Sequence, residues 1–325
     1  MKVGIVGCGL IGCKRAKTLN GAELVICADS NGLRAKSLAN QHVGCLSSDN
    51  WQEVINHPEV SMVIIATHHA LLPEVSFAAV NAKKHVLVEK PGACHAADLE
   101  PVIKAAKINN VLVHVGFNHR YHRSFRKAKS LVDEGALGEL MFIRARYGHG
   151  GRIGYDKEWR AVKELSGGGE LIDQGMHLID LARWFLGDFI NVDGFAHTYF
   201  WDMPVDDNGF MLLRTKNDQT AFLHASSSEW KNLFSFEIYG KHGKIALDGL
   251  GGSYGVERIT FYKMLPEMGP PETTSWEYPM GDNSWEVEFQ EFLEDIKLHR
   301  QPSANLKDAQ AALSIVETIY KESNK

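Results

Sequence analysis

The segment KVGIVGCGLIG, residues 2–12, joins a short apolar run to three glycines in the spacing GxGxxG. An apolar run that leads into such a turn predicts a strand followed by a helix, which is the local fold of a dinucleotide-binding site. Gly7 permits the tight turn, Gly9 lets the backbone approach a pyrophosphate, and Gly12 permits close packing of the helix on the strand. The phosphates are expected at the N-terminus of a helix that runs to about Leu19.

The same residues can also be interpreted as a membrane-targeting signal. One lysine, an apolar run and then Leu10-Ile11-Gly12-Cys13 resemble the lipid-attachment box of a bacterial lipoprotein. The two interpretations are incompatible, because cleavage before Cys13 would remove the strand that the glycine turn requires. The glycines also disfavour the helical apolar core of a signal. We therefore favour the glycine turn and expect Cys13 to be a free, unlipidated thiol.

A carboxylate follows at the end of the next apolar run. The segment ELVICAD, residues 23–29, predicts a second strand that ends at Asp29, where a carboxylate accepts hydrogen bonds from ribose hydroxyls. Asp29 would repel a 2′-phosphate, and Ser30-Asn31 offers no arginine to accept one, so NAD is favoured over NADP. The candidate cofactor-binding residues are Gly7, Gly9, Leu10, Ile11, Gly12, Asp29, Ser30, Thr67, His68, Glu89, Lys90 and Asn118.

The composition restricts the class of protein. The 325 residues carry a formal charge of −5, with 44% hydrophobic and 23% charged residues, which is typical of a globular protein and offers no basic surface for nucleic acid. No run approaches the roughly 18 apolar residues of a membrane span. The five cysteines lack CxxC pairs and the 15 histidines are scattered. We therefore expect reduced thiols, a cytoplasmic protein and no metal site.

Up to about Phe117, short apolar runs alternate with helical stretches. Alternation of this length predicts βαβ crossovers and a parallel sheet, and we expect a Rossmann-type NAD-binding domain over residues 1–118. The apolar runs VIIAT and HVLVEK contain no polar alternation, which indicates strands buried on both faces. The expected strands are 2–6, 23–28, 61–66, 85–88 and 111–115.

After Asn118 the pattern changes to that of an α+β domain, which we expect over residues 119–325. Several β-like runs separated by turn signals predict a large, mostly antiparallel open sheet. The last helix, 306–321, is a candidate for packing back on the first domain. The other expected elements are a helix at 120–133, a strand at 140–149, a glycine-rich loop at 166–169, a helix from Gly169 to Leu186, β-like runs from 191 to about 262, and a helix at 285–299.

The helix expected from Gly169 to Leu186 carries a polar strip. At about 100° per residue, Asp173, His177 and Asp180 fall together, with Trp184 beside them. The strip contains no lysine or glutamate, so we expect it to face a cleft rather than bulk solvent. Histidine has the pKa best suited to accept a proton, which favours an acid–base site over a metal site.

The glycine turn, Asp29, the Glu89-Lys90-Pro91 sequence after a buried strand, and GGGELIDQGMHLIDLARWFLG (167–187) resemble the Gfo/Idh/MocA oxidoreductases, the glucose-fructose oxidoreductase and inositol dehydrogenase family. The resemblance implies a second domain whose open sheet mediates assembly as a homodimer or homotetramer. It also implies that Lys90, Asp173 and His177 are catalytic: His177 takes a hydroxyl proton, Lys90 hydrogen-bonds the reacting oxygen, and Asp173 orients His177. The Lys90–Pro91 peptide bond is expected to be cis, which would aim Lys90 into the cleft.

The substrate is expected to be a sugar, polyol or nucleotide-linked sugar. Arginines and tryptophan in the loop GHGGRIGYDKEWR (148–160) could clamp an anionic group and stack on a ring, which favours an anionic or nucleotide-linked sugar. An NAD-dependent dehydrogenase is the favoured function, and an NAD-dependent glycosidase or a non-catalytic sugar and NAD sensor are the alternatives. The candidate substrate-binding residues are Lys90, Asn118, His119, Arg120, Arg152, Tyr155, Trp159, Arg160, Asp173 and His177.

Overall fold

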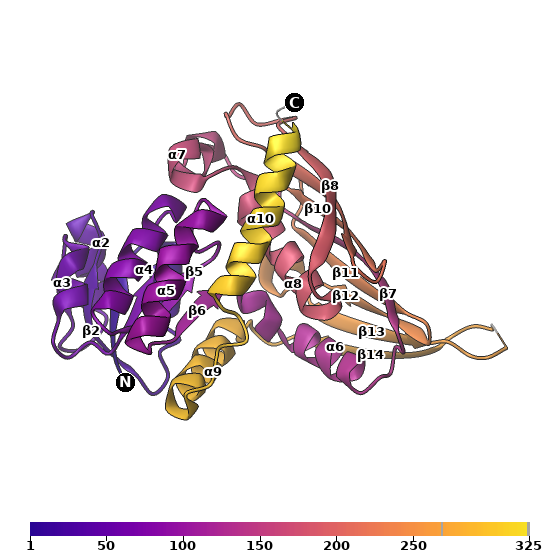
Figure 1. The fold of residues 1–325 in the computed structure, drawn as a ribbon, viewed down its shortest axis with the longest axis horizontal. Helices are drawn as coiled ribbons and strands as arrows, with labels where there is room; N and C mark the ends of the chain where they lie inside the picture. The colour runs from indigo at the N-terminus through magenta and orange to yellow at the C-terminus, as the bar shows by residue number, and fades with distance from the viewer. Residues whose placement is uncertain (268, 324–325) are drawn as a thin grey trace. The chain divides into compact units, whose positions relative to one another are not determined.

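The computed structural model describes residues 1–267 and 269–323 (Figure 1). The chain forms two compact units. The first consists of Met1–Phe117, Glu164–Gly167 and Trp285–Leu313, and the second consists of Asn118–Lys163, Gly168–Ser284 and the residues from Ser314 on. The first unit therefore takes a segment from the C-terminal part of the chain. Helix α10 (Leu306–Ser323) contributes residues to both units.

The first unit is built on a six-stranded sheet in the order β3-β2-β1-β4-β5-β6. All of its strand pairs are parallel, as expected for strands that read as continuous apolar runs. The structure confirms the expected α/β class and adds the three-residue strand β3. The strands are β1 (Lys2–Val6), β2 (Glu23–Ala28), β3 (Leu46–Ser48), β4 (Met62–Ile65), β5 (His85–Glu89) and β6 (Val113–Gly116).

Helices connect these strands and are bounded by local signals. Asn31 and Asn50 cap two of them through side-chain acceptors, and Asn110 ends another in the left-handed conformation. The first helix ends at Ala16, earlier than the predicted Leu19. The helices are α1 (Leu10–Ala16), α2 (Gly32–Ala39), α3 (Trp51–Asn56), α4 (Leu72–Asn81) and α5 (Leu99–Asn109), with 3₁₀ turns at His69–Leu71 and Ala96–Asp98.

A late segment completes the core of the first unit. Helix α9 (Ser284–Leu298) inserts Phe289 and Phe292, both fully buried, into the same hydrophobic cluster as Val3 and Ile5 of β1. The chain after α9 then runs along the edge strand β6, where the Val115 amide donates to the carbonyl of Ala304. The parallel sheet and helix α9 thus share one core.

The second unit is built on an eight-stranded sheet in the order β14-β13-β12-β11-β7-β10-β9-β8. Its strand pairs are antiparallel except for the parallel pair of β7 and β10, which agrees with the predicted mostly antiparallel sheet. The strands are β7 (Leu140–Gly148), β8 (Phe189–His197), β9 (Asn208–Thr215), β10 (Thr220–Ser226), β11 (Leu233–Gly240), β12 (Gly243–Asp248), β13 (Glu257–Lys263) and β14 (Glu272–Tyr278).

Helices α6 (Arg123–Asp133) and α8 (Met176–Leu186) lie along one face of this sheet (Figure 1). Ala221, Leu223 and Ala225 of β10 are fully buried on the covered face, whereas the alternating Phe222 is 49% exposed. None of the described helices is long and apolar enough to cross a bilayer. The remaining short elements are α7 (Lys163–Ser166) and 3₁₀ turns at Asn118–Tyr121, Tyr155–Lys157, Trp159–Ala161 and Gly252–Tyr254.

The helix predicted from Gly169 to Leu186 is two elements. Residues Leu171–Gly175 form a π-helical turn, and the regular α8 begins at Met176. The carboxylate of Asp206 accepts the amides of Gly169 and Leu171, at 2.9 and 2.8 Å, and so fixes the start of this segment. The prediction of one regular helix is therefore wrong for residues 171–175, and projection at 100° per residue does not hold there.

Candidate active site

The three glycines of the GxGxxG fingerprint, Gly7, Gly9 and Gly12, have different steric surroundings. Gly7 has a φ of +95°, and a Cβ there would lie 2.4 Å from the carbonyl oxygen of Ala66. A Cβ on Gly12 would lie 1.8 Å from the Gly7 oxygen, whereas one on Gly9 would have no neighbour within 4 Å. The backbone is therefore crowded where the helix packs on the strand and open at Gly9, where a pyrophosphate is expected to approach.

The Asp29 side chain is held by the glycine turn itself. One carboxylate oxygen accepts the Cys8 amide and the other accepts the Asn31 amide, both at 2.8 Å. An ionised carboxylate has further acceptor capacity, so these two bonds leave room for ribose hydroxyls. Leu10 is 84% exposed in the first turn of α1, Ile11 is half-buried and Ser30 is exposed. Contacts of these residues with a dinucleotide stay predictions.

Thr67 and His68 follow the carboxyl end of β4, and both are half-buried. The Thr67 hydroxyl donates to the carbonyl oxygen of His68 at 3.1 Å. Burial lowers the pKa of His68, which keeps its ring neutral near pH 7. Contact between these two residues and the cofactor stays a prediction.

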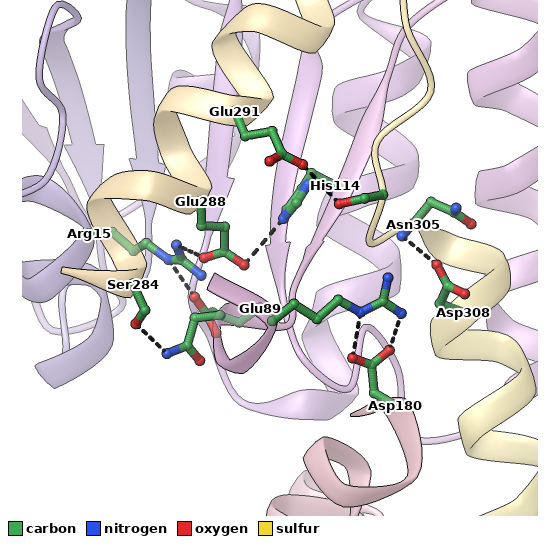
Figure 2. A network of polar contacts seen from close by, with 12 residues as sticks. Arg15, Glu89, His114, Asp180, Ser284, Glu288, Glu291, Asn305 and Asp308 are labelled. Atoms are coloured by element: carbon green, nitrogen blue, oxygen red, sulfur yellow. Dashed lines mark hydrogen bonds and ion pairs between the residues drawn. The ribbon is translucent and has the colours of Figure 1, made fainter. Parts of the chain in front are cut away.

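Glu89 at the end of β5 belongs to a buried charge network that the sequence did not indicate (Figure 2). Nε of Arg15 donates to Glu89 Oε1 at 2.6 Å, and Nη1 of the same side chain donates to Glu288 of α9. The Nε2 atom of His114 lies 3.2 Å from Glu288 Oε1. Side chains of Arg15, His114 and Glu288 are fully buried, so Glu89 has an internal ionic partner beside its predicted cofactor role.

The two carboxyls of this network respond differently to their surroundings. Burial raises the pKa of Glu89. Burial also acts to raise the pKa of Glu288, but Arg15 and His114 hold it below its ordinary value. A Cβ on Gly116 would lie 2.7 Å from Arg15 Nη2 and 2.9 Å from Glu89 Oε2, so the network needs a glycine at this position of β6.

Lys90 follows Glu89 directly and is half-buried. The Lys90–Pro91 peptide bond is cis, as predicted. Within the described residues, no group of three or more His, Cys, Asp or Glu side chains could hold a metal ion. Cys13 is a free thiol of intermediate exposure whose Sγ lies 3.5 Å from the Cys8 carbonyl oxygen.

In the second unit, Asp173 lies in the π-helical turn and His177 in the first turn of α8. Both are buried, with exposed fractions of 6% and 5%. The ring centroid of His177 lies 3.8 Å from that of His119 and 6.2 Å from that of Tyr147. Asp173 Oδ2 accepts a hydrogen bond from Nε of Arg160 at 2.8 Å. These contacts place a buried histidine and a buried, paired carboxylate on the predicted segment.

Ion pairs join the arginines of the predicted substrate loop to carboxylates. Arg152 donates through Nε and Nη2 to the two carboxylate oxygens of Glu158, each at 2.7 Å. Arg160 lies 3.8 Å from Glu158 and its guanidinium stacks 4.6 Å from the ring centre of Trp159. The sequence of the loop indicated that its arginines could bind an anion, but not that Glu158 and Asp173 are their partners.

Tyr155 points inward, where burial raises its pKa far above the ordinary range. Its hydroxyl donates to Glu170 Oε2 at 3.3 Å, and Nε2 of His149 lies 3.4 Å from Glu170 Oε1. Burial raises the pKa of Glu170, with the charge of Asp173 as a smaller cause in the same direction. Glu170 and His149 are polar groups of this region that sequence reasoning missed, although both stand in motifs it had singled out.

Arg120 and Asp180 are brought together in a buried, two-pronged ion pair. Nε and Nη2 of Arg120 donate to the Asp180 carboxylate at 2.8 and 2.5 Å, and both side chains are at most 4% exposed (Figure 2). The expectation that Asp180 faces a cleft is therefore wrong, because Arg120 covers it. Asn118 donates to Ser284 Oγ at 3.0 Å. Substrate contacts of Asn118 and Arg120 stay predictions.

The parallel sheet, the glycine turn and Asp29 together define an NAD-binding domain of the dinucleotide-binding class. Comparison with known families agrees: residues 1–117 match the model described as "Oxidoreductase family, NAD-binding Rossmann fold", and residues 125–246 match the "GFO/IDH/MocA C-terminal domain". The chain belongs to the GFO/IDH/MocA family of oxidoreductases, and NAD is its cofactor. The resemblance inferred from the sequence motifs is confirmed.

Similar proteins include named dehydrogenases. Levoglucosan dehydrogenase of Pseudarthrobacter phenanthrenivorans is 26% identical over 288 residues, which are 76% of this chain and 73% of that protein. Inositol 2-dehydrogenase of Salmonella typhimurium is 30% identical over 194 residues, 58% of this chain and 55% of that protein. The structure of levoglucosan dehydrogenase with NADH and L-sorbose has a TM-score of 0.89 at 23% identity, covering 100% and 97% of the two chains.

Proposed function

We propose that this protein transfers a hydride between a secondary alcohol of a sugar or polyol and NAD, with His177 as the proton acceptor. The observation that carries the proposal is that Asp173 and His177 are both buried, one turn apart, in a chain whose other unit matches the NAD-binding family model. The dehydrogenases named for levoglucosan and inositol support the substrate class. A sensor would need the NAD fold but no proton acceptor.

The proposed division of labour follows from ordinary acid–base chemistry. Bound NAD supplies the hydride acceptor. His177 takes the proton of the hydroxyl that is being oxidised, because a neutral imidazole is a suitable base near pH 7. Lys90 donates a hydrogen bond to the reacting oxygen and stabilises its developing negative charge. Asp173 holds the His177 ring in one orientation and favours its charged form.

The contacts of the arginines narrow the proposed substrate to a neutral sugar or polyol. An anionic substrate was expected because Arg152 and Arg160 could clamp a carboxylate or phosphate. Both arginines already pair with carboxylates of the chain, Glu158 and Asp173. A guanidinium that already donates to an internal carboxylate attracts a second anion less strongly. The two arginines are therefore accounted for without an anionic group on the substrate.

The test is a substrate panel with purified protein and NAD. Neutral sugars, polyols, acidic sugars and nucleotide-linked sugars are incubated in parallel, while NADH absorbance and product mass are followed. NADH formed in step with a ketone product from a neutral substrate supports the proposal. Released aglycone without NADH would instead identify a glycosidase. Binding of sugar without turnover of any panel member would identify a sensor.

We also propose that the protein is a homodimer or homotetramer joined through the open face of the eight-stranded sheet. Phe142, Phe195, Leu212 and Phe222 are 38–49% exposed there, an apolar patch of the kind that marks association sites. We expect Phe222→Lys to shift the mass measured by light scattering toward the monomer, whereas the exposed Lys216→Ala serves as a control without effect. An unchanged mass for Phe222→Lys would place the interface elsewhere.

A further inference from the structure

Arg160 belongs to the predicted substrate loop, but its guanidinium is turned toward the helical segment. Nε donates to Asp173 Oδ2 at 2.8 Å, with the two side chains 30% and 8% exposed. The ring of Trp159 stacks on the guanidinium at 4.6 Å, and Glu158 lies 3.8 Å from Nη1. Three neighbours therefore fix the orientation of this one cation.

The acidic surroundings of Asp173 suggest what the Arg160 guanidinium does. Burial raises the pKa of the nearby Glu170, and the negative charges of Asp173 and Asp206 act in the same direction. In a poorly hydrated region, neighbouring carboxylates disfavour one another's ionised form, and a cation in contact restores it. Arg160 stays charged at any pH of interest, so it is suited to keep Asp173 ionised.

We propose that Arg160 is a positioning residue for the reaction, which acts through Asp173 rather than by binding substrate. It holds the Asp173 carboxylate ionised and in one orientation on the π-helical turn, so that Asp173 can support His177. The inference rests on the proposed function, in which Asp173 and His177 form the acid–base pair. It assigns Arg160 a role different from that of a substrate clamp.

The loop contacts explain why an arginine suits this position. A planar guanidinium can stack on Trp159 and donate in its plane to Asp173 at the same time. A lysine at this position would keep the charge but could not use both contacts in the same geometry. Glu158, which accepts two hydrogen bonds from Arg152, is a second anion close to Arg160.

The test compares three single variants, Arg160→Gln, Arg160→Lys and Asp173→Asn. A double variant combines Arg160→Gln with Asp173→Asn. Arg160→Gln is expected to lower kcat by about tenfold or more, part of the roughly 10²–10⁴-fold that a positioned base contributes, with KM for a neutral substrate little changed. Arg160→Lys should recover part of the loss. The double variant should be no slower than Asp173→Asn alone, because both changes remove one function.

The pH profile of kcat/KM gives a readout that a merely structural role would not move. Without Arg160 the pKa of Asp173 rises, so the acid side of the profile should move to higher pH. The matched control is Arg183→Gln, which removes an arginine paired with Asp188 elsewhere in the same unit and should leave the profile unchanged. Thermal melting and NAD binding show that each variant is folded.

The outcomes separate this inference from the proposed function. If His177→Ala and Asp173→Asn retain near-normal turnover, the proposed function fails whatever Arg160 does. If those variants are impaired while Arg160→Gln behaves as the wild type, or adds its full effect to Asp173→Asn, only the role of Arg160 is overturned. A raised KM for acidic sugars at unchanged kcat would show that Arg160 is a substrate clamp instead.

Discussion

Two arginines each form an ion pair with a carboxylate of the candidate site, and they differ in how far their side chains are buried. Arg15 of the first unit is fully buried between Glu89 and Glu288 and stacks 4.3 Å from the ring centre of Trp285. Arg160 of the second unit makes an analogous stacked ion pair with Asp173, but its side chain is 30% exposed. The two arginines thus make the same kind of stacked ion pair, one fully buried and one partly exposed.

The difference follows from the cost of leaving a charge without its partner. Removing one member of a buried ion pair costs about 3–5 kcal/mol, because the remaining charge stays in a poorly hydrated interior. Removing Arg160 is expected to cost less, because its side chain is 30% exposed and water can replace part of its contact with the buried Asp173. Substitutions at Arg15 are thus expected to report on folding, and substitutions at Arg160 on catalysis.

The largest effect is expected from His177→Ala, which tests whether the second unit carries the chemistry. Turnover should fall by roughly 10²–10⁴-fold, because the proton acceptor is lost. NAD binding, followed by the fluorescence of NADH, should be nearly unchanged, since the fingerprint lies in the first unit. His197→Ala, an exposed histidine of β8, is the control. Near-normal turnover in His177→Ala would mean that His177 is not the proton acceptor, and Arg160 could then not act on catalysis through Asp173 and His177.

Arg15→Met should lower the free energy of unfolding by about 3–5 kcal/mol, because Glu89 and Glu288 would stay buried without their cation. Denaturant unfolding followed by circular dichroism measures the change, and Lys17→Met, on the exposed end of α1, controls for the loss of one positive charge. Adding Glu288→Gln should recover part of the loss. A decrease below about 1 kcal/mol would mean that Arg15 does not differ from Arg160 in the way that its burial indicates.

The smallest effect is expected for the stability of Arg160→Gln, with a loss below the roughly 3–5 kcal/mol of a fully buried pair, because Arg160 is 30% exposed although Asp173 is only 8% exposed. Solvent reaches the guanidinium, so glutamine or water can take over part of its contact with Asp173. The same unfolding experiment that is used for Arg15→Met makes the two values directly comparable. A loss as large as that of Arg15→Met would show that Arg160 is needed for folding, and its effect on kcat would then need a structural explanation.

Features that depend on local spacing were predicted well from the sequence. The glycine turn, the strands of the first sheet and the position of Asp29 each follow from residues close together in the chain. The cis bond before Pro91 followed from the family resemblance. These features depend on backbone geometry and on short motifs, which a single sequence displays directly.

Features that depend on distant partners were not predicted. Arg15 and Glu288 are 273 residues apart, and no pattern near Arg15 indicates that a glutamate from α9 will meet it. Nor does the sequence near Gly169 indicate that Asp206, 35 residues beyond Leu171, accepts the amides of Gly169 and Leu171 at the start of the π-helical segment. The cleft-facing strip failed at Asp180 for the same reason, since periodicity shows which side is polar but not that Arg120 covers it.

The insertion of α9 into the first unit has a consequence for synthesis on the ribosome. Val3 and Ile5 are translated before the second unit, but Phe289 and Phe292, which fill the same core, are translated only after most of it. The nascent NAD-binding half must therefore wait for most of the second unit to be translated before its packing is complete. A gene cut after Phe117 would encode the whole glycine fingerprint yet lack the two phenylalanines and Glu288, so soluble expression of that half would require grafting residues 285–313 onto it.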